Sequence, residues 1–232
     1  MRKHIPNAIT CLNLFSGCVG IVMAFQDKLL FASYAIIIAA ILDFFDGFLA
    51  RLLNAYSNIG KELDSLADVV SFGVLPSVIV YHLFLKAPQI GLLSEYLNYS
   101  AFLIAMFSAL RLAKFNVDTR QEENFLGLPT PANALLIASL PFIISGHSLF
   151  LRDYILNAFF LFTLSLGMSI LLVWEIPLMS LKFKSFNFNQ NLYRYILLIV
   201  AAVLILIFKF VAVPVIIFLY ILLSIIQFRL IK

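Results

Sequence analysis

Long apolar runs dominate the chain, and their lengths predict membrane-spanning helices. A helix needs about 20 mostly apolar residues to cross the hydrocarbon core of a bilayer. Runs of this length recur between short polar segments and predict eight spans, at about 6–25, 29–52, 64–86, 96–115, 131–149, 154–174, 192–209 and 210–229. Only Lys209 and the break near Pro214 separate the last two runs. We expect two spans there, because a single helix over 192–231 would be roughly 60 Å long, about twice the thickness of the core.

The composition agrees with this interpretation. Hydrophobic residues make up 63% of the chain and charged residues 12%, whereas about a quarter of the residues in a soluble domain are charged. No internal repeat or low-complexity tract marks a domain boundary. We therefore predict an all-α polytopic membrane protein with about eight transmembrane helices, in a single integral membrane domain over residues 1–232.

The basic residues predict how the chain is oriented. With eight spans, four of the 16 lysine and arginine residues fall on one side of the membrane and all the others on the opposite side; the four are Lys28, Lys86, Arg152 and Lys209. Because basic residues gather in cytoplasmic loops, both termini and the loops after the second, fourth and sixth spans should face the cytoplasm. We expect the cytoplasmic (inner) membrane of a prokaryote. The positive-inside bias and the attraction of basic residues to anionic headgroups account for the net charge of +4, so no nucleic-acid partner is expected.

Four aspartates within the predicted spans carry the strongest functional signal. Asp43 and Asp46 lie three residues apart near the end of the second span, and Asp64 and Asp68 lie four apart at the start of the third. These spacings place each pair on one helix face, and a short turn makes the two span ends neighbours. Carboxylates inside a membrane are costly and usually functional. Four of them at one depth would repel one another, and a hard divalent cation, Mg²⁺ or Mn²⁺, resolves that conflict.

Small residues and one arginine accompany these acids. Gly47 and Ala50 follow Asp43 by one and two turns, and Gly60 precedes Asp64 by one turn. A face without bulky side chains lets an extended ligand approach the backbone, and Arg51 offers bidentate hydrogen bonds to a phosphate. A metal, a phosphate-binding arginine and space for a ligand together favour phosphoryl-type transfer.

The acids and small residues form a pattern that resembles a known signature. The pattern D-x2-D-G-x2-A-R-x8-G-x3-D-x3-D, typical of the CDP-alcohol phosphatidyltransferase family, is matched at all eight defined positions: Asp43, Asp46, Gly47, Ala50, Arg51, Gly60, Asp64 and Asp68. The resemblance implies a six-helix catalytic core, which the first six spans (1–175) would supply, with 192–231 as an additional C-terminal helix pair. It also implies a homodimer.

The resemblance assigns roles to individual residues. Asp43, Asp46 and Asp64 would bind the metal, with Asp68 as general base and as a further ligand. Gly47 and Ala50 would make room for a cytidine nucleotide, beside Gly60, and Arg51 would hold the phosphates. Asn7, Thr10 and Asn13 resemble the nucleotide-contacting first helix of the family. The implied reaction is attack by an alcohol on the phosphorus of CDP-diacylglycerol that bears the lipid, with release of CMP.

A second stretch resembles the phosphatidylserine synthase branch of this family and implies L-serine as the acceptor. It comprises Arg111–Val117 and Gly127–Ala132. Serine is a zwitterion, so its site needs a cation for the carboxylate and an acceptor for the ammonium. The candidate acceptor-binding residues are Arg111, Lys114, Asn116, Thr130 and Asn133. Arg111 and Lys114 would equally serve as ordinary cytoplasmic anchors of their helix.

Other interpretations stay open at this point. Glycerol phosphate or inositol phosphate as acceptor, or an ether lipid as donor, would keep the same chemistry. The four acids would also suit a secondary transporter, although transporter sites usually lie near the membrane midplane between repeats. A structural membrane protein, in which the acids form ion pairs between the second and third spans, is the remaining alternative.

Overall fold

The computed structural model describes residues 4–88, 96–118, 125–146, 148–179 and 191–230. In the first half of the chain these residues form α1 (His4–Phe25), α2 (Leu29–Leu52), α3 (Asn58–Asp68), α4 (Leu75–Lys86) and α6 (Leu103–Val117). A π-helical turn, η1 (Val69–Val74), joins α3 to α4 into one long helix, and a 3₁₀ turn, η2 (Asn98–Phe102), leads into α6.

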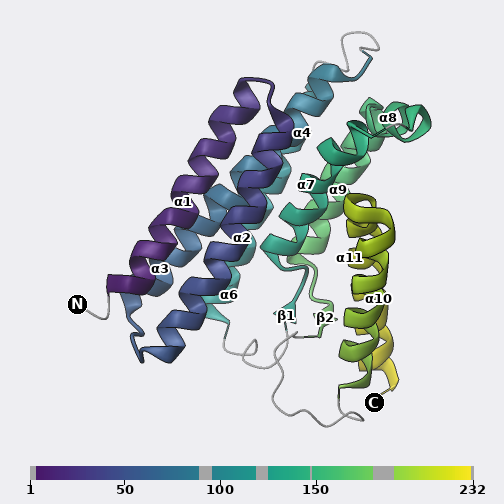
Figure 1. Ribbon diagram of the computed structural model, residues 1–232. Helices are drawn as coiled ribbons and strands as arrows, with labels where there is room; N and C mark the ends of the chain where they lie inside the picture. The colour runs from purple at the N-terminus through teal and green to yellow at the C-terminus, as the bar shows by residue number, and fades with distance from the viewer. Residues whose placement is uncertain (1–3, 89–95, 119–124, 147, 180–190, 231–232) are drawn as a thin grey trace.

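In the second half, α7 (Thr130–Ile144), α8 (Leu149–Ile155) and α9 (Ala158–Val173) are followed by α10 (Leu192–Phe208), η4 (Lys209–Val211) and α11 (Ala212–Leu230). Two short strands, β1 (Phe125–Leu126) and β2 (Pro177–Leu178), pair antiparallel. The protein is thus an all-helical polytopic membrane protein with one small β ladder at an end of the bundle (Figure 1).

The helices follow the predicted spans closely. Within the described part of the chain, five helical stretches are long and apolar enough to cross a membrane, and a sixth joins them if α8 and α9, which are bent by 65°, count as one span. The stretch Leu192–Phe228 is one of the five, but the backbone breaks at Lys209, where φ is 51°. Beyond this break α11 returns alongside α10 (Figure 1). The last two predicted spans therefore form a helical hairpin.

Three boundaries differ from the sequence-based prediction. The third span begins at Asn58 rather than residue 64, because the Ser57 side chain caps the helix by accepting a hydrogen bond from the Gly60 amide at 3.0 Å. The fifth ends at Ile144 rather than residue 149, and the sixth begins at Ala158 rather than residue 154. Between them lies the separate short helix α8, which ends at Ile155, and Asn157 then caps the start of α9.

Small residues let α1 pack closely against its neighbours. The buried face of α1 consists of small or polar residues: Pro6, Thr10, Asn13, Ser16, Gly17, Gly20 and Ala24. A Cβ atom on Gly20 would lie 2.5 Å from Leu75 and 2.8 Å from Ala35, so only glycine fits. Ser16 donates a hydrogen bond to the Ala35 carbonyl at 2.9 Å. Such small-residue contacts and interhelical hydrogen bonds are typical of helix association in membranes.

This close approach can be tested by adding one methyl group. We expect Gly20→Ala to destabilise the protein by about 1–3 kcal/mol, the usual cost of overpacking. Gly167→Ala is the matched control, because a Cβ atom at Gly167 would meet nothing within 4 Å. Thermal unfolding in mild detergent measures both variants. Equal stability of the two variants would contradict the close packing of α1.

Candidate active site

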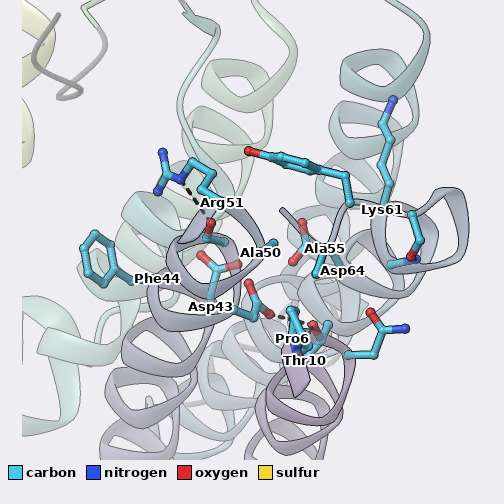
Figure 2. A pocket seen from close by; sticks show the side chains of 15 residues that line it. Pro6, Thr10, Asp43, Phe44, Ala50, Arg51, Ala55, Lys61 and Asp64 are labelled. Carbon is cyan, nitrogen blue, oxygen red and sulfur yellow. Dashed lines mark hydrogen bonds between the residues drawn. The ribbon is translucent and has the colours of Figure 1, made fainter. Parts of the chain in front are cut away.

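The candidate site is a cavity of about 480 Å³ where α1, α2 and α3 meet. It reaches the turn between α2 and α3, at the end of the bundle where α1 begins (Figure 1). Figure 2 shows the side chains that surround it. The lining residues are Pro6, Asn7, Thr10, Asp43, Phe44, Asp46, Gly47, Ala50, Arg51, Ala55, Tyr56, Ser57, Gly60, Lys61 and Asp64.

The helical periodicity of α2 and α3 brings three carboxylates together. Asp43, Asp64 and Asp68 each place one oxygen so that all three oxygens lie within 4.8 Å of one another. Asp43 and Asp64 are half-buried and face the cavity (Figure 2), whereas Asp68 lies deeper, with only 7% of its surface exposed. The turn between the helices is short because Ser57 caps α3 directly after it.

Asp46 lies in the same cavity but has a different partner. Its Oδ2 accepts a hydrogen bond of 2.7 Å from the Thr10 hydroxyl of α1, and its side chain is buried. It lies outside the group of three close oxygens formed by the other aspartates. The fourth carboxylate therefore connects α2 to α1.

The carboxylate group has the chemistry of a divalent-cation site. Asp64 Oδ1 is buried and makes no hydrogen bond. Within the described residues, none of the four aspartates forms an ion pair with lysine or arginine, since the salt bridge found there joins Lys86 to Asp27. Close, unpaired carboxylate oxygens are ligands that suit Mg²⁺ or Mn²⁺. The alternative of interhelical ion pairs receives no support from these contacts.

The predicted nucleotide-binding residues surround the carboxylates. Six of the seven line the cavity: Asn7, Thr10, Gly47, Ala50, Arg51 and Gly60. A Cβ atom on Gly47 would meet nothing within 4 Å, so this part of the wall is open, while one on Gly60 would lie 3.0 Å from Asn7 Oδ1. Arg51 donates from Nε to the Gly47 carbonyl at 3.0 Å, which leaves its terminal nitrogens for a ligand.

The seventh residue, Asn13, is not among the residues that line the cavity. Its side-chain Nδ2 donates to Asp68 Oδ1 at 3.4 Å, and its side-chain Oδ1 is buried without a hydrogen-bond partner. Asn13 therefore contacts a carboxylate of the cluster rather than the cavity itself.

Six lining residues were not predicted from the sequence and belong to no defined position of the signature: Pro6, Phe44, Ala55, Tyr56, Ser57 and Lys61. For Lys61, the one sequence feature that could have predicted a place in the cavity wall is its position directly after the signature residue Gly60. Tyr56 lies in the turn after α2, where no periodicity places a side chain.

The five predicted acceptor-binding residues fall into different environments. Arg111 is 6% exposed, and its guanidinium lies 5.9 Å from the centre of the Phe115 ring. Arg111 also interacts electrostatically with Asp68, which places it toward the carboxylate cluster. A residue that only anchors its helix at the membrane surface would be exposed, so the burial of Arg111 does not fit that role. Lys114 is exposed and does fit it. Both line a second, small cavity beside Leu126 and Glu175.

Of the other three predicted acceptor-binding residues, one forms hydrogen bonds between helices and two are buried without hydrogen-bond partners. Asn116 connects two helices: its amide donates to Ser65 Oγ at 2.8 Å, and its carbonyl accepts from Lys61 Nζ at 3.0 Å. Thr130 and Asn133, in the first turn of α7, are completely buried. The Thr130 hydroxyl and both polar atoms of the Asn133 amide have no hydrogen-bond partner. Buried polar groups of this kind call for a partner.

Comparison with known proteins identifies the family. The sequence profile of the CDP-alcohol phosphatidyltransferases matches residues 3–174. The chain belongs to the CDP-alcohol phosphatidyltransferase family. Members of this family use a divalent metal, in agreement with the aspartate cluster.

Individual relatives match more than half of the chain. It is 39% identical over 134 residues to a CDP-diacylglycerol–serine O-phosphatidyltransferase of Helicobacter pylori, covering 57% of this chain and 54% of that protein. An enzyme of the same name from Bacillus subtilis is 39% identical over 141 residues, 60% of this chain and 76% of the relative. An archaetidylserine synthase of Methanothermobacter thermautotrophicus is 34% identical over 137 residues, 58% of this chain and 56% of the relative. The chain thus spans about half the length of the Helicobacter relative.

Metal binding by the carboxylates can be measured without turnover. We expect Asp64→Asn to weaken Mn²⁺ binding by at least about tenfold, because even partners outside the ligand shell contribute that much at metal sites. Glu62→Gln is the control, since it removes an exposed carboxylate from the same helix. Electron paramagnetic resonance of free Mn²⁺ gives both affinities. Equal losses in the two variants would argue against a site at the cluster.

Proposed function

We propose that the protein transfers the phosphatidyl group of CDP-diacylglycerol to the hydroxyl of L-serine, forming phosphatidylserine and CMP. The observation that carries this proposal is the group of three carboxylate oxygens within 4.8 Å, beside a cavity walled by small residues and Arg51. Membership of the family supports the reaction class. The serine-specific relatives support the choice of acceptor.

The cavity has a suitable form for the nucleotide half of the donor. Gly47 and Ala50 leave the α2 wall open, and the free end of the Arg51 guanidinium is placed to bind phosphate oxygens. Asn7 and Thr10 approach from α1 on the opposite side. The exposed apolar helix surfaces around the site would meet the acyl chains of the lipid.

Arg111 is our candidate for binding the serine carboxylate. It is buried, and its Nε has no hydrogen-bond partner, so an anionic ligand would satisfy it. Its electrostatic interaction with Asp68 supports a role close to the carboxylates. A single buried arginine suits a carboxylate, whereas the dianionic phosphate of glycerol phosphate or inositol phosphate would call for several cations.

Asn133 is a second acceptor-site candidate because of its register. α2 and α7 run in opposite directions (Figure 1), and the Tyr34 and Phe142 rings of these helices meet at 4.9 Å. Asp43 follows Tyr34 by nine residues in α2, and Asn133 precedes Phe142 by nine residues in α7. Because the helices are antiparallel and both rise about 1.5 Å per residue, Asp43 and Asn133 lie at about the same height along the bundle. The unpartnered amide of Asn133 would thus lie near the cluster, available to the serine ammonium or hydroxyl.

Asp68 is the proposed general base. Its carboxylate, held by the Asn13 amide at 3.4 Å, would take the proton of the serine hydroxyl while the serine oxygen forms a bond to the phosphorus that bears diacylglycerol. The bond from that phosphorus to the bridging oxygen breaks, and CMP leaves with the electron pair. Arg51 would hold the phosphate oxygens during this exchange. Asp43, Asp46 and Asp64, with Asp68, would hold a divalent cation that neutralises the charge on the phosphates.

The position of the cavity supports a particular orientation of the protein in the membrane and disfavours the transporter alternative. The cavity reaches the α2–α3 turn rather than the middle of the bundle, unlike the usual transporter site. The start of α1 and the end of α11 lie at this same end (Figure 1). The distribution of basic residues along the sequence supports a cytoplasmic position for this end. Six of the residues that contribute to it lie outside the described residues: Arg2, Lys3, Arg120, Lys182, Lys184 and Lys232. We retain the homodimer as a prediction.

A second candidate function has one specific observation in its favour. The alignment with the archaetidylserine synthase, at 34% identity, covers 137 residues, close to the 134 and 141 residues aligned with the Helicobacter and Bacillus enzymes. An ether-lipid donor would keep the carboxylate cluster, Arg51 and the acceptor site unchanged. Assays with both CDP-lipids distinguish these donors.

The direct test is incorporation of radiolabelled serine into lipid by purified protein with CDP-diacylglycerol and Mn²⁺ or Mg²⁺. We expect metal-dependent incorporation with an equal release of CMP. Glycerol 3-phosphate and inositol phosphate, run in parallel, should give little product. Turnover with one of these alcohols instead of serine would retain the family chemistry and refute the serine site. No CMP release with any acceptor, from folded protein, would refute the proposed reaction.

The base assignment has its own test. Asp68→Asn should lower kcat by at least about 100-fold, the usual contribution of a general base. Glu62→Gln, a nearby exposed carboxylate, should turn over normally. Near wild-type turnover of Asp68→Asn with metal binding intact would remove Asp68 from this role.

A further inference from the structure

The C-terminal hairpin, α10 and α11, lies outside the part of the chain that matches the family profile, which ends at residue 174. The proposed chemistry gives it no role. It nevertheless packs against the body of the protein, with α11 in contact with α7 and β2 (Figure 1). Ile217, Tyr220 and Leu223 of α11 are buried in the core.

α11 holds one backbone position of the loop after α9 by two hydrogen bonds. The Tyr220 hydroxyl donates to the Met179 carbonyl at 3.0 Å, and the Met179 amide donates to Ser224 Oγ at 3.2 Å. Ser224 in turn donates to the Tyr220 carbonyl at 2.7 Å. All three residues are buried. Because buried backbone groups in a membrane protein need internal partners, these side chains fix the residue that follows β2.

Backbone hydrogen bonds connect the segment around Met179 to the residues that lead into α7. β2 pairs with β1, and beyond the ladder the Gly127 amide donates to the Ile176 carbonyl at 3.0 Å and the Leu128 amide to the Leu171 carbonyl at 2.9 Å. Gly127 has φ of +77°, and a Cβ atom there would lie 2.5 Å from the Leu172 carbonyl oxygen. Two residues after Leu128, α7 begins at Thr130.

The same segment forms a wall of the small cavity at Arg111. Leu126 of β1 and Leu172, Val173 and Glu175 at the end of α9 line this cavity. Through the paired strands β2 and β1, the hairpin therefore holds a segment that lines the same cavity as Arg111.

We propose that Tyr220 and Ser224 are positioning residues for the acceptor site: by holding Met179 they fix the wall that faces Arg111 and the first turn of α7. The C-terminal hairpin then sets the affinity for the acceptor alcohol and leaves the donor site, on α1 to α3, unaffected. This inference rests on the proposed function, because it uses the acceptor site assigned there.

The test is Tyr220→Phe, which removes only the hydroxyl, together with Ser224→Ala. Tyr193→Phe is the matched control, a half-buried tyrosine of the same hairpin. We expect each of the two variants to raise KM for serine about tenfold, as the loss of a buried hydrogen bond does. KM for CDP-diacylglycerol should stay within about twofold of the wild type, and the control should match the wild type in both. A parallel rise of both KM values, or no change in KM for serine, would overturn the proposal.

A second readout does not depend on turnover. Hydrogen exchange at the amides of Gly127 and Met179, followed by mass spectrometry of the metal-loaded protein, should be faster in Tyr220→Phe than in the wild type. Exchange in α1 and α2 should be unchanged. Unchanged exchange at Gly127 would overturn the positioning role even in an enzyme that uses another alcohol. Absence of serine turnover in the wild type, by contrast, would refute only the assignment of serine, and the KM comparison would then use the alcohol that reacts.

Discussion

Electrostatic repulsion among three carboxylates is the constraint on which this structure depends. Two like charges about 5 Å apart repel by roughly 3 kcal/mol at an effective dielectric constant of about 20, and Asp43, Asp64 and Asp68 form three such pairs within 4.8 Å. A divalent cation turns this repulsion into attraction. α2 and α3 must therefore keep a fixed distance and register. The Ser57 cap after the short turn and the Thr10–Asp46 hydrogen bond to α1 both hold that register.

Close backbone approach, rather than large apolar side chains, holds together the helices around the proposed donor site. Gly17 and Gly20 bring α1 against Ser71 and Leu75, and Ser71 donates to the Asn13 carbonyl at 3.0 Å. The proposed acceptor site is held differently, by α7, the β ladder and α11, of which β2 and α11 lie beyond the family profile. On this proposal, a rigid donor site is combined with an acceptor site that elements outside the profile support.

The sequence predicted what depends on local spacing. Helical periodicity alone placed Asp43 with Asp46 and Asp64 with Asp68, and the length of 192–231 was enough to predict the hairpin. Contacts between distant segments could not be predicted in this way. Thr10 and Asp46 are 36 residues apart, and β1 and β2 belong to segments about 50 residues apart, each with only two paired residues. The burial of Arg111 depends on packing between α6 and its neighbours, which a basic residue at a helix end does not reveal.

The measurement that tests the account most directly is the position of the metal. Crystals of the protein grown with Mn²⁺, and with data collected at the manganese absorption edge, would locate the ion by its anomalous scattering. We expect a peak among the carboxylates of Asp43, Asp64 and Asp68, on the side of the cavity that holds Arg51. A peak elsewhere, or well-ordered aspartates with no peak at saturating Mn²⁺, would contradict this expectation.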